Sequence, residues 1–467
     1  MLFSSLTFLT TFLPLVLFLY YIADKKFRNA ILCLASLLFY AWGEPKFIIL
    51  MLISIVANYF FALWISKAKK RSKKPLLILS IIFNIALLGF FKYFNFGISI
   101  FENVTGKQLN LPLIELPIGI SFYTFQILSY VVDVYRGKVK VQKNIVTLAT
   151  YIALFPQLIA GPIVQYSDVE KQLKDRKESL DLFIEGVKRF VLGLAKKVII
   201  ANNVAYIADT LYAQPITEVS TIGLWLAAIA YTLQIYFDFS GYSDMAIGLG
   251  KMFGFNFLEN FNYPYIATSI KDFWRRWHIS LSKWFRDYIY IPLGGNRVSK
   301  LKWVRNIMIV WMLTGLWHGA NWNFILWGLF YGVLLLLEGT ILAKPLSKLP
   351  TWIRYILTMF IVVIGWTIFR VEHLSTLAAT LGKMFGVGAS FSLSEVFYSN
   401  YTLITSLPYI LIGILFVTPY LRKAFCKLEQ KCIWLIPVKY LVYLGMFGLT
   451  IVFLISSSYN PFIYFRF

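Results

Sequence analysis

Apolar stretches of about 20 residues recur along this chain, and they constrain its fold more than any other feature. A helix needs about 20 mainly apolar residues to cross the hydrocarbon core of a bilayer. Such stretches run from Leu2 to the last residues. Of the 467 residues, 59% are hydrophobic and only 14% are charged. The pattern predicts an all-α, polytopic membrane protein of about eleven or twelve transmembrane or re-entrant helices. We expect one membrane domain over residues 1–467, with the lipid bilayer as its solvent.

The basic residues are concentrated in the loops between the apolar stretches. The formal net charge is +23, which by itself would also suit a nucleic-acid-binding protein. Residues 67–74, however, carry six cations and no acid, and residues 136–143, 271–305 and 422–431 are also basic. Cytoplasmic loops collect Lys and Arg. We therefore expect these loops in the cytosol, and we expect no nucleic-acid partner.

The segments 102–115, 214–220 and 372–400 contain at most one lysine each and are predicted to face outward. The apolar runs leave the basic side and return to it in three pairs, and counting them predicts that both termini lie outside. These pairs are 29–46 with 47–66, 75–100 with 116–135, and 352–371 with 403–421.

Two apolar regions are interrupted by helix-breaking residues. FPQLIAGPI, at positions 155–163, contains Pro156, Gly161 and Pro162. Around TGLWHGANW, Gly315 and Gly319 are predicted to interrupt the helix. Broken backbone at membrane depth is tolerated where protein or a water-filled cavity satisfies it, so we expect re-entrant elements at both places.

His318 is the most informative ionisable residue. It lies within residues 307–337, a stretch that contains no Lys, Arg, Asp or Glu. Such a residue is costly to bury unless it faces a cavity or a partner. A dry pocket favours the neutral imidazole, which can act as a general base. Helical spacing puts Thr314 and Asn321 beside the ring, and we expect one of them to orient it. The alternative is a structural histidine bonded to a neighbouring carbonyl.

The segment SIKDFWRRWHISLSKWFRDYIYIPLGGNR projects as one two-faced helix, with aromatic residues on one arc, cations opposite and His278 at the border. A basic, aromatic helix is typical of an element that lies along the cytoplasmic membrane surface. Arginine and lysine also bind phosphate groups. We therefore predict that Arg275, Arg276, Lys283 and Trp274 bind an anionic donor and that His278 lines the mouth of its channel.

Three further sets of residues could take part in chemistry. Asp238 and Tyr242, in YFDFSGYSDMAIG, share one helix face and are predicted to hold a histidine or a neighbouring helix end by hydrogen bonds, or to be purely structural. His373, between charged neighbours, is predicted to be solvated. The three cysteines form no metal-binding pattern with histidine, so we expect neither a metal site nor a disulfide framework.

Three segments in this order, FDFSGYSDMAIG, FWRRWHISLSKWFRDYIYIPLGG and LTGLWHG, closely resemble the motifs of the membrane-bound O-acyltransferase family. The 40 residues from His278 to His318 fit the family's spacing. SFYTFQILSYVVDVYRG, FPQLIAGPI and the tail FIYFRF are similar to the bacterial branch that O-acetylates polysaccharides, the alginate type. The resemblance covers nearly the whole chain.

The resemblance implies a ring of helices around a thin centre, where a channel from the cytosol meets a funnel from outside. It implies that His318 is the essential catalytic residue and that His278 is a second important one. The implied donor is cytosolic acetyl-CoA, used as a substrate with no bound cofactor. The implied partner is a separate extracytoplasmic acetyltransferase that modifies a polysaccharide outside the bacterial cytoplasmic membrane, whether inner or sole. For the oxyanion we expect Asn321, Trp317 or backbone amides near Gly319.

Several alternatives stay open at this point. Transfer can be direct, or it can pass through an acetyl-histidine. Within the enzyme class, the runner-up is D-alanyl transfer to teichoic acid from a carrier protein, and peptidoglycan O-acetylation is a further alternative. Outside it, a transporter or flippase would need paired intramembrane charges or repeat symmetry, and the sequence indicates neither.

Overall fold

The computed structural model describes residues 1–391, 397, 400–432, 435–456, 459–461 and 463. Every regular element in these ranges is a helix, as the apolar periodicity predicts. Seven helices are long and apolar enough to cross a membrane, or eight if one bent pair counts as a single span. The chain is therefore an all-α, multi-pass membrane protein, while the number of about eleven or twelve crossings stays a prediction. The FIYFRF motif, Ile463 excepted, and part of the predicted outer segment 372–400 lie outside the described residues.

The chain divides into two compact units, which are described separately here. Unit 1 comprises Met1–Phe190 and Ser243–Glu259, and unit 2 comprises Val191–Tyr242 and Asn260–Phe467. The single domain over the whole chain stays a prediction. Unit 1 contains η1 (Phe8–Phe12), α1 (Leu13–Ile22), η2 (Lys25–Phe27), α2 (Arg28–Gly43), α3 (Ile48–Lys67), α4 (Lys70–Thr105), α5 (Ile120–Tyr135), α6 (Ile145–Ala153), α7 (Phe155–Leu158), α8 (Tyr166–Lys174), the first part of α9 (Leu180–Ala195) and the last part of α11 (Thr221–Met252).

Unit 2 holds the remaining helices, including the rest of α9 and α11. Its other elements are η3 (Lys196–Ala201), α10 (Asn202–Tyr212), η4 (Pro264–Ile266), α12 (Ile270–Arg276), α13 (Ile279–Phe285), η5 (Arg286–Tyr290), α14 (Lys300–His318), α15 (Trp322–Gly339), α16 (Ala343–Lys348), α17 (Thr351–Arg370), α18 (Leu374–Met384), α20 (Tyr401–Ser406), α21 (Pro408–Phe416), α22 (Tyr420–Lys431) and α23 (Leu435–Ser456).

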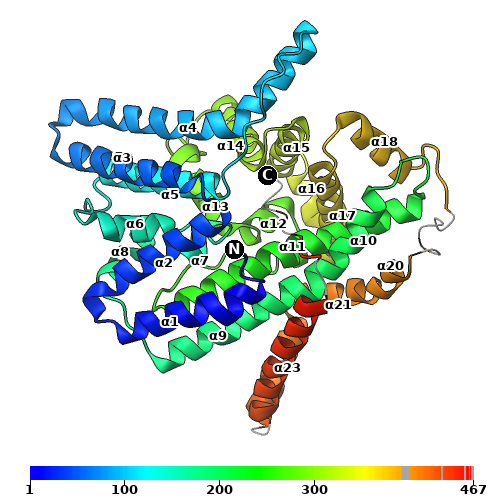
Figure 1. Cartoon of the computed structure of the whole chain (residues 1–467). Coiled ribbons are helices and arrows are strands. Elements are labelled where there is room, and N and C mark those ends of the chain that lie inside the picture. Colours follow the sequence, from blue (N-terminus) through cyan, green and yellow to red (C-terminus); the bar gives the residue numbers. More distant parts are fainter. Residues whose placement is uncertain (392–396, 398–399, 433–434, 457–458, 462, 464–467) are drawn as a thin grey trace. The chain divides into compact units, whose positions relative to one another are not determined.

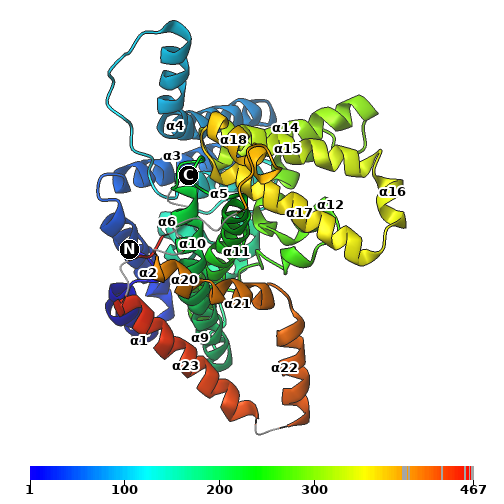
Figure 2. The same ribbon diagram turned by 90° about the vertical axis from the view of Figure 1, so that its right-hand side faces the viewer.

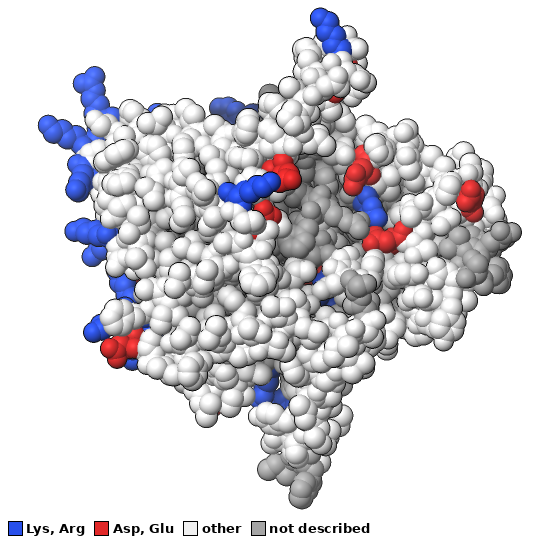
Figure 3. Space-filling view, viewed as in Figure 1, with Lys and Arg blue, Asp and Glu red and all other residues white. Residues whose placement is uncertain are grey.

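In unit 1, α3, α4 and α5 pack against one another (Figure 1). Asn58 of α3 and Asn84 of α4 exchange side-chain hydrogen bonds of 3.0 and 2.7 Å, and both are buried. Polar pairs of this kind hold helices together in lipid, where an unbonded amide would find no water. The basic residues 67–74 lie where α3 gives way to α4, and Figure 3 shows Lys and Arg gathered at this edge of unit 1.

The predicted helix break in FPQLIAGPI is confirmed. Helix α6 ends at Ala153, and the separate four-residue helix α7 follows. Residues 159–165 are not helical, and the whole stretch 155–165 is buried. The freed backbone groups have side-chain partners. Ser36 accepts the amide of Phe155 at 3.0 Å, and Gln157 donates to the carbonyl of Tyr151 at 2.6 Å. Such satisfaction is the condition for broken backbone inside a membrane protein.

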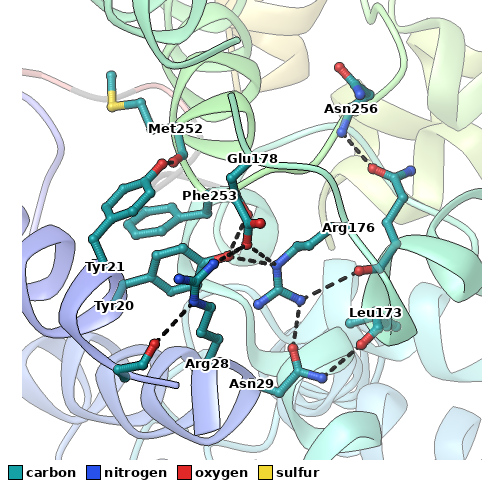
Figure 4. Close-up of polar contacts among 12 residues, drawn as sticks. Tyr20, Tyr21, Arg28, Asn29, Leu173, Arg176, Glu178, Met252, Phe253 and Asn256 are labelled. Carbon is teal, nitrogen blue, oxygen red and sulfur yellow. Dashed lines mark hydrogen bonds and ion pairs between the residues drawn. The ribbon is translucent and has the colours of Figure 1, made fainter. Parts of the chain in front are cut away.

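A charged network holds the termini of several unit 1 helices together (Figure 4). Arg28, at the start of α2, donates to Glu178 at 2.7 Å. Tyr20 of α1 donates to the same carboxylate at 2.8 Å and accepts from Arg176 at 2.8 Å. Arg176 also donates to Asn29 at 2.7 Å. The Glu178 carboxylate therefore contacts two largely buried guanidinium groups and a phenol.

In unit 2, α14, α15 and α17 lie side by side (Figure 2). Helix α14 runs through Gly315 and stops at His318, so the predicted interruption at Gly315 is wrong, whereas the one at Gly319 is confirmed. The reason is packing. A Cβ on Gly315 would collide with the carbonyl of Phe324 in α15, and one on Gly328 would collide with that of Trp311. These glycines allow two helix backbones to approach closely, which is a common device in membrane helix pairs.

Replacing Glu178 by Gln should destabilise the protein by about 1.5–3 kcal/mol at neutral pH, because hydrogen bonds to charged groups contribute that much. Burial alone would raise the pKa of Glu178, but the bonds from Tyr20 and Arg28 outweigh burial and lower the pKa. The folded state thus binds the carboxyl proton less tightly than the unfolded state. The stabilisation is present above the ordinary carboxyl pKa and is lost as pH falls through the folded-state pKa.

Thermal unfolding in detergent, followed at pH 7 and at pH 3–4, tests this prediction. The difference in unfolding temperature between the native protein and Glu178→Gln should become smaller at the lower pH. Glu185→Gln is the control, because its 2.7 Å pair with Lys251 is exposed and should contribute little. Equal effects of the two substitutions at pH 7 would contradict a special role for Glu178.

Candidate active site

A cavity of about 250 Å³ in unit 2 brings both motif histidines together. Its lining residues come from α12, α13, η5, α14 and α15, and from the break between α12 and α13. The lining combines cations, aromatic rings and two imidazoles, and it is largely apolar otherwise. The lining residues are Lys271, Trp274, Arg275, Trp277, His278, Leu281, Ser282, Phe285, Arg286, Tyr290, Val310, Trp311, Thr314, His318 and Leu335.

His318 is the last residue of α14, where the chain leaves the helix. Only 6% of the residue is exposed. Its ring is held in edge contacts by Trp327 at 5.1 Å and Phe369 at 5.2 Å between ring centroids. Gly319 follows because a side chain there would overlap the ring of Phe324. Aromatic packing therefore fixes the imidazole at the cavity wall, as an ionisable residue in an apolar stretch predicts.

The two residues expected to orient His318 have other hydrogen bonds in the structure. Thr314 donates to the carbonyl of Val310 at 2.7 Å and lines the cavity. Asn321 caps α15, because its side-chain oxygen accepts the amide of Trp322 at 2.6 Å. Trp317 is buried and contacts the rings of both histidines, at 5.0 Å from His318 and 5.9 Å from His278.

The single helix predicted for the FWRRWHISLSKWF region is wrong. The region forms two short helices, α12 and α13, and breaks between them at His278, whose backbone is left-handed with φ +44°. Residues of the preceding loop form backbone hydrogen bonds with the residues on either side of this break. Asn262 donates its amide to the carbonyl of Arg276 at 2.9 Å, and Ile279 donates to the carbonyl of Asn260 at 3.0 Å. Two residues of the aromatic arc, Phe273 and Trp277, are both below 3% exposed.

His278 is 2% exposed and lines the cavity beside its partner histidine. Its ring packs edge-on against Phe239 of α11 at 4.7 Å, and its Nδ1 lies 3.2 Å from Oδ1 of Asn260. Burial lowers the pKa of His278 to about 3. The ring is therefore neutral at physiological pH, and it lies deeper than a residue at the mouth of a channel.

Only some of the predicted donor-binding cations reach the cavity. Arg275 lines it and, among the described residues, has no ion pair. Arg276 instead pairs with Asp272 at 2.9 Å and donates to the carbonyl of Asn262. Lys283 is not among the lining residues, whereas Lys271 and Arg286, which were not predicted to bind the donor, are. The chain breaks at His278 between α12 and α13, so one helical wheel does not describe both helices.

Trp274 lines the cavity in a cluster of aromatic rings, and its binding of the donor stays a prediction. Its ring lies 4.7 Å from Trp311 and 4.9 Å from Tyr331, both edge-on. The cluster packs α12 against α14 and α15 at this side of the cavity.

Asp238 contacts a neighbouring helical element, which is one of the alternatives that the sequence left open. It pairs with Lys197 of η3 at 2.7 Å, and both side chains are almost fully buried. Its other oxygen accepts the amide of Ile463 at 2.9 Å, close to the carboxyl-terminal residue. Tyr242, one turn away, is also buried. Neither described partner of Asp238 is a histidine. His373 is exposed, as predicted.

Comparison with known proteins decides the family. The sequence profile of the membrane-bound O-acyltransferase family matches residues 37–374. The chain belongs to this family. The match spans most of unit 1 and the whole lining of the cavity.

Relatives of this O-acyltransferase carry related names. A probable alginate O-acetylase of Pseudomonas aeruginosa is 46% identical over 408 residues, which cover 86% of this chain and 78% of the relative. A peptidoglycan O-acetyltransferase of Helicobacter pylori is 38% identical over 428 residues, covering 83% and 80%. A teichoic acid D-alanyltransferase of Bacillus subtilis is 35% identical over 231 residues, covering 47% and 58%.

The O-acyltransferase cavity combines three chemical capacities. Two buried imidazoles can accept or donate hydrogen bonds, an apolar wall can exclude water, and cations can bind a phosphorylated molecule. The sequence motifs indicated both histidines. They did not indicate Asn260, because its role depends on a loop that pairs with a break 18 residues later.

Proposed function

We propose that this membrane O-acyltransferase moves an acetyl group from cytosolic acetyl-CoA across the membrane for O-acetylation of an extracytoplasmic polysaccharide. The observation that carries the proposal is the shared cavity, in which His318 and His278 lie together with the cations Lys271, Arg275 and Arg286. The similarity to proteins named alginate O-acetylase supports the acyl group and the polymer class.

The chemistry follows from the properties of a thioester. The acceptor hydroxyl oxygen attacks the carbonyl carbon, the C–S bond breaks, and an ester forms. His318 takes the hydroxyl proton and returns it to the departing thiolate, so protons balance over the cycle. General base catalysis of this kind contributes roughly 10²–10⁴ in rate. The buried, ring-packed position of His318 supports this assignment, because an imidazole held in one orientation is ready for proton transfer.

The oxyanion of the tetrahedral intermediate needs donors that are already in place. Trp317, with its indole beside both histidines, is our candidate side chain. The amides beyond His318 are further candidates, because the chain at Gly319 leaves the helix with an extended backbone. Asn321 is the weaker candidate, since its oxygen caps α15.

The charge of the cavity supports acetyl over D-alanyl transfer. A D-alanyl thioester carries an ammonium group beside its carbonyl carbon. Among the described residues, the cavity lining contains three cations and no carboxylate, and one of these cations, Arg286, pairs with Asp287 at 2.8 Å. The lining cations would repel this ammonium at short range. An acetyl group has no charge to accommodate, and the same cations attract the phosphates of CoA.

The acceptor side and the location complete the proposal. We place the chain in a bacterial cytoplasmic membrane with both termini outside, because basic loops such as residues 67–74, at one edge of unit 1, are typical of the cytoplasmic side. A separate extracytoplasmic acetyltransferase receives the acetyl group and modifies the polymer. Peptidoglycan is the second candidate acceptor, favoured by the similarity to a peptidoglycan O-acetyltransferase.

Replacing His318 by Gln should reduce acetyl transfer from labelled acetyl-CoA by at least about 100-fold, because the general base is lost. The measurement uses purified protein in lipid vesicles and follows the release of free CoA thiol. The exposed His373, replaced by Gln, is the matched control and should keep native activity. Undiminished CoA release by the His318 variant would reject the mechanism.

Replacing Arg275 and Arg286 together by Gln should raise the KM for acetyl-CoA about tenfold, a loss of about 1.4 kcal/mol in donor binding. The kcat should change little, because both guanidinium groups bind the phosphate end and not the reacting carbon. Arg297→Gln, an exposed cation outside the cavity, is the control. An unchanged KM in the double variant would exclude donor binding by these arginines.

A further inference from the structure

Asn260 is a fully buried residue whose side-chain oxygen accepts three hydrogen bonds. The donors are the Ser280 amide at 3.1 Å, the Ser280 hydroxyl at 2.9 Å and the Nδ1 side of His278 at 3.2 Å. Asn260 is 0% exposed. All three contacts converge on the backbone break between α12 and α13.

These contacts determine which way the Asn260 carboxamide faces. The Ser280 amide is always a donor, so the atom that faces it must be the oxygen and not the NH₂ group. The backbone donor therefore fixes which end of the Asn260 carboxamide is the oxygen. The oxygen has no proton to give, so the His278 nitrogen beside it must carry one.

We propose that Asn260 is a positioning residue that holds His278 as the Nδ1–H tautomer, so that Nε2 of His278 is a bare hydrogen-bond acceptor at the cavity. Among the described residues, Nε2 has no hydrogen-bond partner, although it is buried. A buried acceptor without a partner is costly and is usually matched by a ligand or water. The nitrogen is thus the part of His278 that remains for substrate.

Two further observations support a neutral, fixed ring. Burial lowers the pKa of His278 to about 3, because removal from water disfavours the charged imidazole. The ring is also clamped edge-on to Phe239 at 4.7 Å, which restricts its rotation. The hydrogen bond to Asn260 therefore selects one tautomer, and packing holds it in place.

The role of this nitrogen rests on the proposed function. In the acyl transfer proposed above, a hydroxyl must enter the cavity and a thiol must leave it. Both carry a proton that Nε2 can accept in a hydrogen bond. His278 would then align one of these groups while His318 acts as the base, which gives the two histidines different tasks in one cavity.

Solid-state ¹⁵N spectra of the chain labelled at histidine test the tautomer directly. The double variant His318→Gln with His373→Gln leaves His278 as the one labelled residue. We expect a protonated Nδ1 and a bare Nε2 at pH 7. A protonated Nε2, or a doubly protonated ring, would overturn the proposal. This readout does not depend on the donor, so its failure is distinguishable from failure of the acetyl-CoA assignment.

Two substitutions at position 260 separate positioning from folding. In Asn260→Leu, the Nε2–H tautomer should appear and kcat should fall about tenfold to a hundredfold, as is typical when a group that orients a functional histidine is lost. Asn260→Asp retains the acceptor, so the Nδ1–H tautomer should persist while the added charge moves protonation of the ring to higher pH. Asn262→Asp, an exposed neighbour in the same loop, should change neither property.

Each of these variants tests whether Asn260 positions the His278 ring. A His278 tautomer unchanged in Asn260→Leu would show that Asn260 does not position the ring. If Asn260→Leu fails to fold, the titration of His278 in Asn260→Asp decides instead. An unshifted titration in that variant would contradict the contact between the two side chains.

Discussion

Backbone groups freed at a helix break must find hydrogen-bond partners, and in an apolar chain this requirement determines where a polar site can form. His318 ends α14, and His278 separates α12 from α13. At the second break, Asn260 and Asn262 supply both backbone and side-chain partners. The cost of leaving helical geometry is thereby offset at the same positions that present imidazoles to a cavity.

Close packing of the surrounding helices depends on the smallest side chains. Gly315 and Gly328 bring α14 and α15 into backbone contact, and Gly319 leaves space for Phe324. The approach places His318 among Trp327 and Phe369. In lipid, where apolar surface is not driven out of water, such van der Waals contact and interhelical hydrogen bonds stabilise the fold. His318 is therefore positioned by packed helices.

Much of the fold was predictable from the sequence, because a membrane helix depends on local composition. The apolar runs 29–46 and 47–66, which form α2 and α3, follow from length, and the break in FPQLIAGPI follows from proline. The division of FWRRWHISLSKWF at His278 was not predictable, since its periodicity is that of one helix and the break depends on a distant loop. Lys271 and Arg286 line the cavity although neither was predicted to bind the donor, whereas Arg276, which was, pairs with Asp272. For Asp238 a neighbouring helix was among the predicted alternatives, but the sequence could not identify Lys197 as its partner.

We propose that acyl transfer takes place in the cavity shared by His278 and His318. An experimental structure of the protein in lipid with a thioether analogue of acetyl-CoA, which cannot transfer its acyl group, would show where the donor binds. We expect the analogue's carbonyl group against His318 and its phosphates near Arg275 and Arg286. An analogue bound with its carbonyl outside this cavity would contradict the proposed mechanism.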